Sequence, residues 1–145
     1  MNKKRVAGML AGVMVLSLGL TGCGETTATV KNSLPQEFSA YDGETLASTI
    51  TINDVQCSVS DNTISVEVVG SCTYVNQDCT VEGIVTAAPS IDVRLLDEDG
   101  KEVSSQLGQM HLTLTEGQEI EESYTFNVSD SNAYTVELYS NNDSE

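Results

Sequence analysis

The sequence contains no tryptophan, two prolines, one histidine and only six Lys and Arg residues among its 145 positions. Three of those six are Lys3, Lys4 and Arg5, whereas all 22 acidic residues follow position 24. From Cys23 onward three basic residues therefore face 22 acidic ones, a formal charge of −19. Phosphate repels such a chain, which excludes nucleic-acid binding, and the charge also opposes docking on an anionic lipid surface. The length allows one domain.

No apolar run is long enough for a permanent transmembrane helix. The run from Val6 to Leu20 would cover roughly 22 Å as a helix, short of the ~30 Å hydrocarbon core of a bilayer. It follows the basic segment Asn2-Lys3-Lys4-Arg5, and this order is typical of a cleaved secretory signal.

The apolar run ends in Leu20-Thr21-Gly22-Cys23, which resembles the lipobox of bacterial lipoproteins. The resemblance implies cleavage after Gly22 and a diacylglycerol on the Cys23 thiol, whose acyl chains hold the protein on the extracytoplasmic face of the cell membrane. Two acyl chains anchor stably, whereas one does not. Because Gly24 stands where a retention signal has Asp, the resemblance implies the outer membrane in a diderm host. The alternative is an ordinary export signal.

We divide the chain into a signal peptide (1–22), a lipidated N-terminus with a flexible tether (23–44), a folded domain (45–141) and a C-terminal tail (142–145). The tether is predicted because this stretch is small, polar and without a sustained period. Phe38 and Tyr41 are its exceptions, and they allow a short leading strand that packs on the domain.

From Leu46 the apolar residues recur with a period of two, which predicts β-strands. The phase changes between Ile52 and Val55 and predicts a β-bulge there. Turns are predicted at 60–62, 76–78, 97–100 and 116–118. Seven to eight short strands, apolar on one face, predict an all-β, antiparallel, immunoglobulin-like β-sandwich.

The segment from Val93 to Val103 resembles the hairpin of FxLYD domains, small immunoglobulin-like domains of bacterial lipoproteins. Leu95 and Asp97 keep the motif, while Val93 and Leu96 replace its Phe and Tyr. Leu114-Thr115-Glu116-Gly117-Gln118-Glu119 is similar to the family's later turn. The resemblance covers residues 63 to 139, supports a fold and a location, and transfers no site, because the family has no established catalytic residues.

The sequence offers few residues that could form a catalytic site. His111 is the only histidine and is predicted on the outward face of a strand from Met110 to Leu114. A nucleophile activated by this imidazole needs a neighbouring Ser or Cys and an orienting carboxylate, and no Gly-x-Ser-x-Gly elbow is present. We therefore predict that the protein is not an enzyme.

Metal binding rests on acidic loops. Asp97, Asp99 and Glu102 offer hard oxygen ligands for Ca²⁺, although the spacing departs from the EF-hand pattern. A solvated hairpin tip is the alternative. A zinc site from His111 and the cysteines lacks the Cys-x-x-Cys spacing typical of such sites.

Beyond Cys23 three cysteines remain. Cys72 and Cys79 flank the segment 73–78, and a hairpin centred there would set them opposite each other for a disulfide. Cys57 lies in the inward phase of its strand and is predicted to be a buried thiol.

Together these features predict a lipid-anchored, non-catalytic binding or accessory module of the cell envelope with a protein partner. The Asp97–Gly100 tip and the Tyr74–Asp78 loop are its candidate contact points. The alternative is a calcium- or small-ligand-binding lipoprotein, for example one associated with a transporter.

Overall fold

The computed structural model describes residues 26–129 and 131–140, and almost all of its regular structure is β. Within these two ranges one 3-10 helix, Gln77–Cys79, interrupts the strands. The strands are β1 (Thr27–Val30), β2 (Gln36–Asp42), β3 (Thr45–Ser60), β4 (Thr63–Val75), β5 (Thr80–Val81), β6 (Ile84–Val85), β7 (Ile91–Leu96), β8 (Glu102–Gln106), β9 (Glu119–Asn127) and β10 (Ala133–Ser140).

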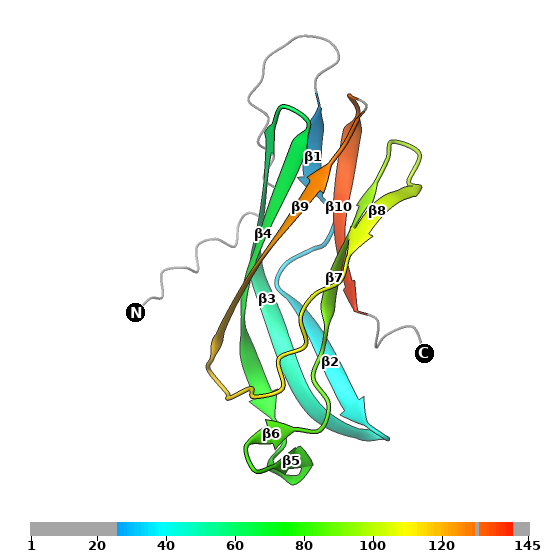
Figure 1. Ribbon diagram of the computed structural model, residues 1–145. Coiled ribbons are helices and arrows are strands. Elements are labelled where there is room, and N and C mark those ends of the chain that lie inside the picture. Colours follow the sequence, from blue (N-terminus) through cyan, green and yellow to red (C-terminus); the bar gives the residue numbers. More distant parts are fainter. Residues whose placement is uncertain (1–25, 130, 141–145) are drawn as a thin grey trace.

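Eight of these strands form two four-stranded sheets that pack face to face (Figure 1). Sheet A has the order β1-β10-β7-β8 and sheet B the order β2-β3-β4-β9, while β5 and β6 form a separate small hairpin. Every pair is antiparallel except β1 with β10, which run parallel. The predicted immunoglobulin-like β-sandwich is confirmed, with this one parallel pair as a departure.

The core lies between the sheets, as the period of two predicts. Along β10 the side chains of Tyr134, Val136 and Leu138 are buried, whereas those of Thr135 and Glu137 are only half-buried. The predicted bulge is confirmed as a register shift between Ile52 and Asp54, which lets Ile52 and Val55 both face the core.

Two of the predicted turns owe their shape to residues that tolerate a positive φ. Asp61, between β3 and β4, has a φ of 56°, and Gly100, in the β7–β8 turn, has a φ of 82°. Glycine adopts this left-handed conformation without the penalty that a Cβ brings, and Asp tolerates it better than most residues.

The prediction of a flexible tether over 23–44 is wrong from Thr26 onward. β1 pairs with β10, and β2 pairs with β3 along its whole length. Of the two exceptions, Phe38 is buried in the core, whereas Tyr41 is 58% exposed. The folded domain therefore begins about twenty residues earlier than predicted.

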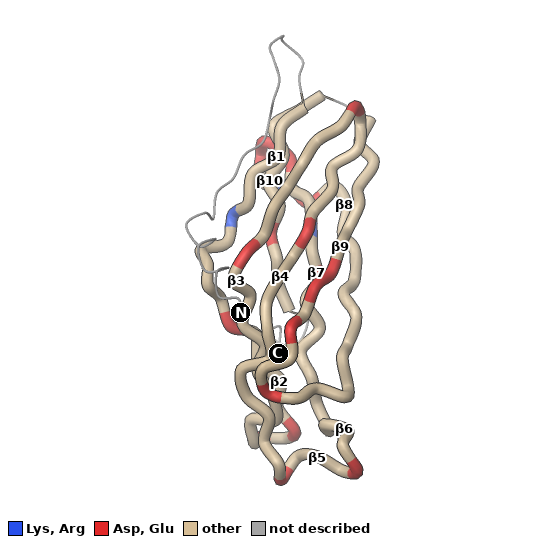
Figure 2. The backbone as a smooth tube through the Cα atoms, turned by 90° about the vertical axis from the view of Figure 1, so that its left-hand side faces the viewer, with Lys and Arg blue, Asp and Glu red and all other residues tan. Residues whose placement is uncertain are grey.

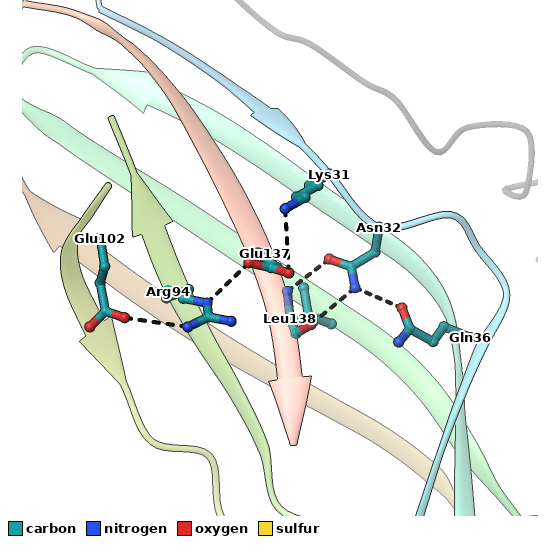
Figure 3. A network of polar contacts seen from close by, with 7 residues as sticks. All are labelled: Lys31, Asn32, Gln36, Arg94, Glu102, Glu137 and Leu138. Carbon is teal, nitrogen blue, oxygen red and sulfur yellow. Dashed lines mark hydrogen bonds and ion pairs between the residues drawn. The ribbon is translucent and has the colours of Figure 1, made fainter. Parts of the chain in front are cut away.

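Asn32 explains why the segment between β1 and β2 stays on the domain (Figure 3). Its side-chain amide donates to the carbonyl oxygen of Leu138 (3.0 Å) and accepts from the N–H of the same residue (2.8 Å). The Asn32 Nδ2 also lies 2.6 Å from Gln36 Oε1. One side chain thus takes the place of a backbone ladder step, just beyond the end of β1.

The two ends of the sandwich differ in what they carry (Figure 1). β1 begins at the end that also holds the β3–β4 and β7–β8 turns; we call this the β1 end. The β5–β6 hairpin and the β2–β3 turn lie at the opposite end, the β5–β6 end. The connection from β8 to β9, residues 107–118, runs from the middle of the molecule toward the β5–β6 end.

Candidate functional site

The predicted lipidation residue, Cys23, lies outside the described residues, as do the signal peptide and the C-terminal tail. Within the ranges 26–129 and 131–140 no helix has the length and hydropathy needed to cross a bilayer.

The hairpin predicted to join Cys72 and Cys79 does not exist. Cys72 lies inside β4, opposite Ile50 of β3, and the strand continues to Val75. Cys79 ends the 3-10 helix that follows, so the two residues are not cross-strand neighbours. Both thiols are buried and free, as is Cys57. Burial raises the pKa of Cys57 to about 12 and also raises that of Cys72.

Two of the three carboxylates proposed as calcium ligands, those of Asp97 and Glu102, make other contacts. Asp97 Oδ1 accepts hydrogen bonds from the N–H groups of Asp99 and Lys101, both at 2.9 Å, and these backbone donors lower the Asp97 pKa. Glu102 forms an ion pair with Arg94 at 3.5 Å. In the described part of the chain no three His, Cys, Asp or Glu side chains gather in a way that suits a metal ion.

The predicted strand from Met110 to Leu114 is also absent. Residues 107–118 are irregular except for a single bridge between Ser90 and Met110. His111 is therefore not an outward-facing strand residue. Its Nε2 lies 2.6 Å from Glu122 Oε2, and the two side chains are only 24% and 13% exposed.

Glu122 connects His111 to a polar cluster beneath the β8–β9 connection. It occupies the inward phase of β9 between Ile120 and Tyr124, and its Oε1 lies 2.5 Å from the Tyr124 hydroxyl. The oxygen of that hydroxyl lies 2.9 Å from the carbonyl oxygen of Ile91 in β7, so two acceptors share its single proton. Burial, together with the Glu122 and Asp92 carboxylates, raises the pKa of Tyr124.

Asp92 is the second component of this cluster and is fully buried. Its Oδ1 accepts from the N–H of Gly108 at 2.8 Å and from Ser90 Oγ at 3.2 Å, while its Oδ2 has no hydrogen-bond partner. A Cβ on Gly108 would come within 2.0 Å of the Ile91 carbonyl oxygen, so only glycine allows this close approach. Asp92 and Glu122 thus hold the β8–β9 connection against the sandwich.

Charge is distributed unequally between the two sheets. The strands of sheet B contain Glu37, Asp54, Glu67 and Glu121 among their acidic residues but no Lys or Arg (Figure 2). The Lys and Arg residues within the described ranges lie instead on or beside sheet A. Lys31 and Arg94 both pair with Glu137 (Figure 3). The Arg94 guanidinium also lies over the Tyr139 ring, 4.3 Å from its centroid.

Exposed apolar side chains gather on two neighbouring segments, one at the β5–β6 end and one that leads toward it from the middle of the molecule. Val81 and Ile84 belong to the β5–β6 hairpin, and Leu107, Met110 and Leu112 belong to the β8–β9 connection. The two segments are joined by a hydrogen bond from Val85 N to Leu112 O at 2.9 Å.

Tyr74, predicted on a loop, lies within β4 near the same end and is 38% exposed. Its exposure is compatible with the predicted contact role, but the segment that carries it is a strand up to Val75. The turn that follows begins at Asn76, whose side chain accepts from the N–H of Asp78 at 2.9 Å.

The sequence contained one signal for the polar cluster. Glu122 shares the phase of Ile120, Tyr124 and Phe126, so a carboxylate on the core face was visible in the alternation. Asp92 carried no such signal, because it lies in the outward phase of β7 and is buried only by the β8–β9 connection.

No protein-family model and no curated protein matches the chain. Among solved structures, one likeness is to the variable (V) domain of the AgI/II polypeptide BspA from Streptococcus agalactiae. It has 10% sequence identity and a TM-score of 0.23, and it covers 94% of this chain and 92% of that one. At that TM-score the likeness does not establish a relationship.

Proposed function

We propose that this protein is a lipoprotein, anchored through Cys23 on the extracytoplasmic face of the membrane, that acts as a non-catalytic binding module of the envelope. In a diderm host that membrane is the outer one. The order of basic segment, apolar run and Leu20-Thr21-Gly22-Cys23 supports the anchor. The FxLYD-like hairpin, with Leu95 and Asp97, supports the same setting.

The position at which the folded chain begins is the observation that carries the proposal. Only Gly24 and Glu25 separate Cys23 from Thr26, so at most about 10 Å of chain separates the anchor from the domain. β1 follows at once and starts at the β1 end (Figure 1). An anchor at Cys23 therefore holds the β1 end beside the lipid and leaves the β5–β6 end free for a partner.

This arrangement changes which loops are candidates for binding. The β7–β8 turn, with Asp97 and Asp99, lies at the β1 end and faces the membrane in the anchored protein. The β5–β6 hairpin and the β8–β9 connection face away from it, and they carry the exposed apolar side chains. The binding function is accordingly assigned to the β5–β6 end.

The anchor is tested by expressing the full chain in a bacterium supplied with a labelled fatty acid. We expect label on the protein and its recovery with membranes, and Cys23→Ala should lose both. Cys57→Ala is the matched control, because it removes a buried thiol and leaves the lipobox intact. Label that persists in Cys23→Ala, or a wild-type chain without label, would refute the anchor.

A further inference from the structure

The exposed apolar residues of the β5–β6 end form a surface of defined composition. Of the eight large hydrophobic residues that are exposed, five lie on two hydrogen-bonded segments, with exposed fractions from 43% to 74%. We call them the distal apolar surface: Val81, Ile84, Leu107, Met110 and Leu112. Single exposed apolar side chains are ordinary on proteins, but a concentration of this kind marks an interaction surface.

The fold holds these side chains outward. On the β8–β9 connection two of the residues between them are tied to the sandwich: Gly108 N donates to Asp92, and His111 pairs with Glu122. Leu112 is fixed through its carbonyl oxygen to β6. The connection is thus pinned on both sides of Met110, so its apolar side chains are presented in a preorganised arrangement, which lowers the cost of binding.

The surroundings of this surface are anionic. Glu82 lies in the β5–β6 turn, between Val81 and Ile84, and its side chain is exposed. Asp42 Oδ2 accepts a hydrogen bond from Thr86 Oγ1 at 2.8 Å, next to the Val85–Leu112 contact. No Lys or Arg occurs on the β5–β6 hairpin, on the β8–β9 connection or in the strands of sheet B, and in Figure 2 the strands of sheet B carry red but no blue.

We propose that the distal apolar surface, with the carboxylates of Glu82 and Asp42 beside it, docks a protein segment that combines apolar side chains with Lys or Arg. The inference rests on the proposed function, which leaves the β5–β6 end free in the anchored protein. Charge complementarity selects the occupant, since an acidic segment or an anionic lipid surface is repelled by the flanking carboxylates. Apolar burial supplies the affinity.

Synthetic peptides test the docking directly. The probe is a twelve-residue peptide of alternating Lys and Leu, and its controls are Lys-Ser and Glu-Leu peptides of the same length. Binding to the purified full-length protein in non-ionic detergent is followed by fluorescence anisotropy. We expect the Lys-Leu peptide to bind about tenfold more tightly than the Lys-Ser peptide, the factor expected for burying one or two apolar side chains. Equal affinity for both would overturn the proposal.

Variants locate the binding. Met110→Ser with Leu112→Ser should weaken Lys-Leu binding about tenfold, and so should Val81→Ser with Ile84→Ser, which serves as a second test on the neighbouring segment. Val103→Ser is the matched control, because Val103 is 48% exposed on β8, away from this surface. Unchanged peptide binding in both double variants would refute the site. The site would also be refuted if the wild-type protein forms a dimer that either double variant abolishes, since the surface would then bind a second copy of the chain.

The proposed anchor and the proposed docking surface can be refuted independently of each other. The Cys23→Ala protein is expected to bind the Lys-Leu peptide with wild-type affinity, because the distal apolar surface does not involve the lipid. Loss of lipid label with intact peptide binding would count against the anchor alone. Retained label with no preference for the Lys-Leu peptide would count against the docking surface alone.

Discussion

At the scale of single residues, the free thiol of Cys57 has a measurable effect on stability. Its neutral form is buried within the core, which raises its pKa from an ordinary value of 9.0 to about 12. Above pH 9 the thiol ionises in the unfolded chain but not in the folded one, so rising pH favours unfolding.

We predict that ionisation of Cys57 makes the free energy of unfolding depend on pH only above pH 9. Between pH 9 and 12 this contribution lowers the free energy of unfolding by up to about 1.4 kcal/mol per pH unit. Cys57→Ala removes this contribution, while Tyr124 and Cys72, whose pKa values are also raised, retain theirs. Urea unfolding of both proteins at pH 8, 9, 10 and 11 measures the difference. Parallel losses in the two chains would contradict the prediction.

The residues of the core were largely predictable, whereas those of the polar cluster were not. Period-two alternation places Val136 and Leu138 inside because their neighbours in the chain are polar. Alternation does not predict the burial of Asp92, since a carboxylate in the outward phase of a strand is normally solvated. It is buried by a segment sixteen residues later in the chain, a contact that no local pattern contains.

At the scale of elements, the failure of the tether prediction has a physical cause. Segments such as Thr27–Val30 and Gln36–Asp42 are small, polar and separated by Pro35, which is typical of linkers. They are strands because the edges of both sheets accept their backbones, and strand formation depends strongly on such tertiary contacts. The prediction of a Cys72–Cys79 hairpin was wrong for a related reason. β3 is long enough to pair with β4 as far as Val75, so Cys72 lies within a strand that continues past it.

We predict that Asn32→Ala lowers the free energy of unfolding by about 2 kcal/mol. The substitution leaves both the N–H and the carbonyl of Leu138 without the amide that satisfies them, and unpaired buried polar groups are costly. Asn127→Ala is the matched control. Asn127 is exposed on β9 and only accepts a 3.3 Å bond from Thr63, so a loss below about 0.5 kcal/mol is expected. Chemical denaturation compares the variants, and equal losses would contradict the role of Asn32.

At the scale of the whole molecule, the two ends of the sandwich and the two sheets differ in composition. The β1 end lies next to the proposed anchor at Cys23, and the β5–β6 end presents exposed apolar side chains. Lys31 and Arg94 pair with Glu137 on or beside sheet A, whereas the strands of sheet B contain carboxylates but no Lys or Arg. Charge patterning of this kind could not be derived from the linear order, because β9 joins sheet B although its neighbours β8 and β10 belong to sheet A.

We predict that in membranes the β1 end lies closer to the lipid than the β5–β6 end. Asp99→Cys and Glu82→Cys place fluorophores on exposed turns at the two ends. Spin-labelled headgroups should quench the fluorophore at position 99 more strongly, because their effect is short-ranged. In the Cys23→Ala background both positions should be quenched equally little. Stronger quenching at position 82 would reverse the proposed orientation.

The parallel pairing of β1 with β10 has a mechanical consequence. A pull that holds the N-terminus at one end and a bound partner at the other acts along β1, roughly parallel to its direction. All β1–β10 hydrogen bonds then bear the load at the same time in shear, instead of being peeled apart one after another. The Asn32 contacts with Leu138 lie at the far end of β1, in line with the same force. In the proposed anchored protein the first strand of the domain would therefore resist tension between the membrane and a bound partner.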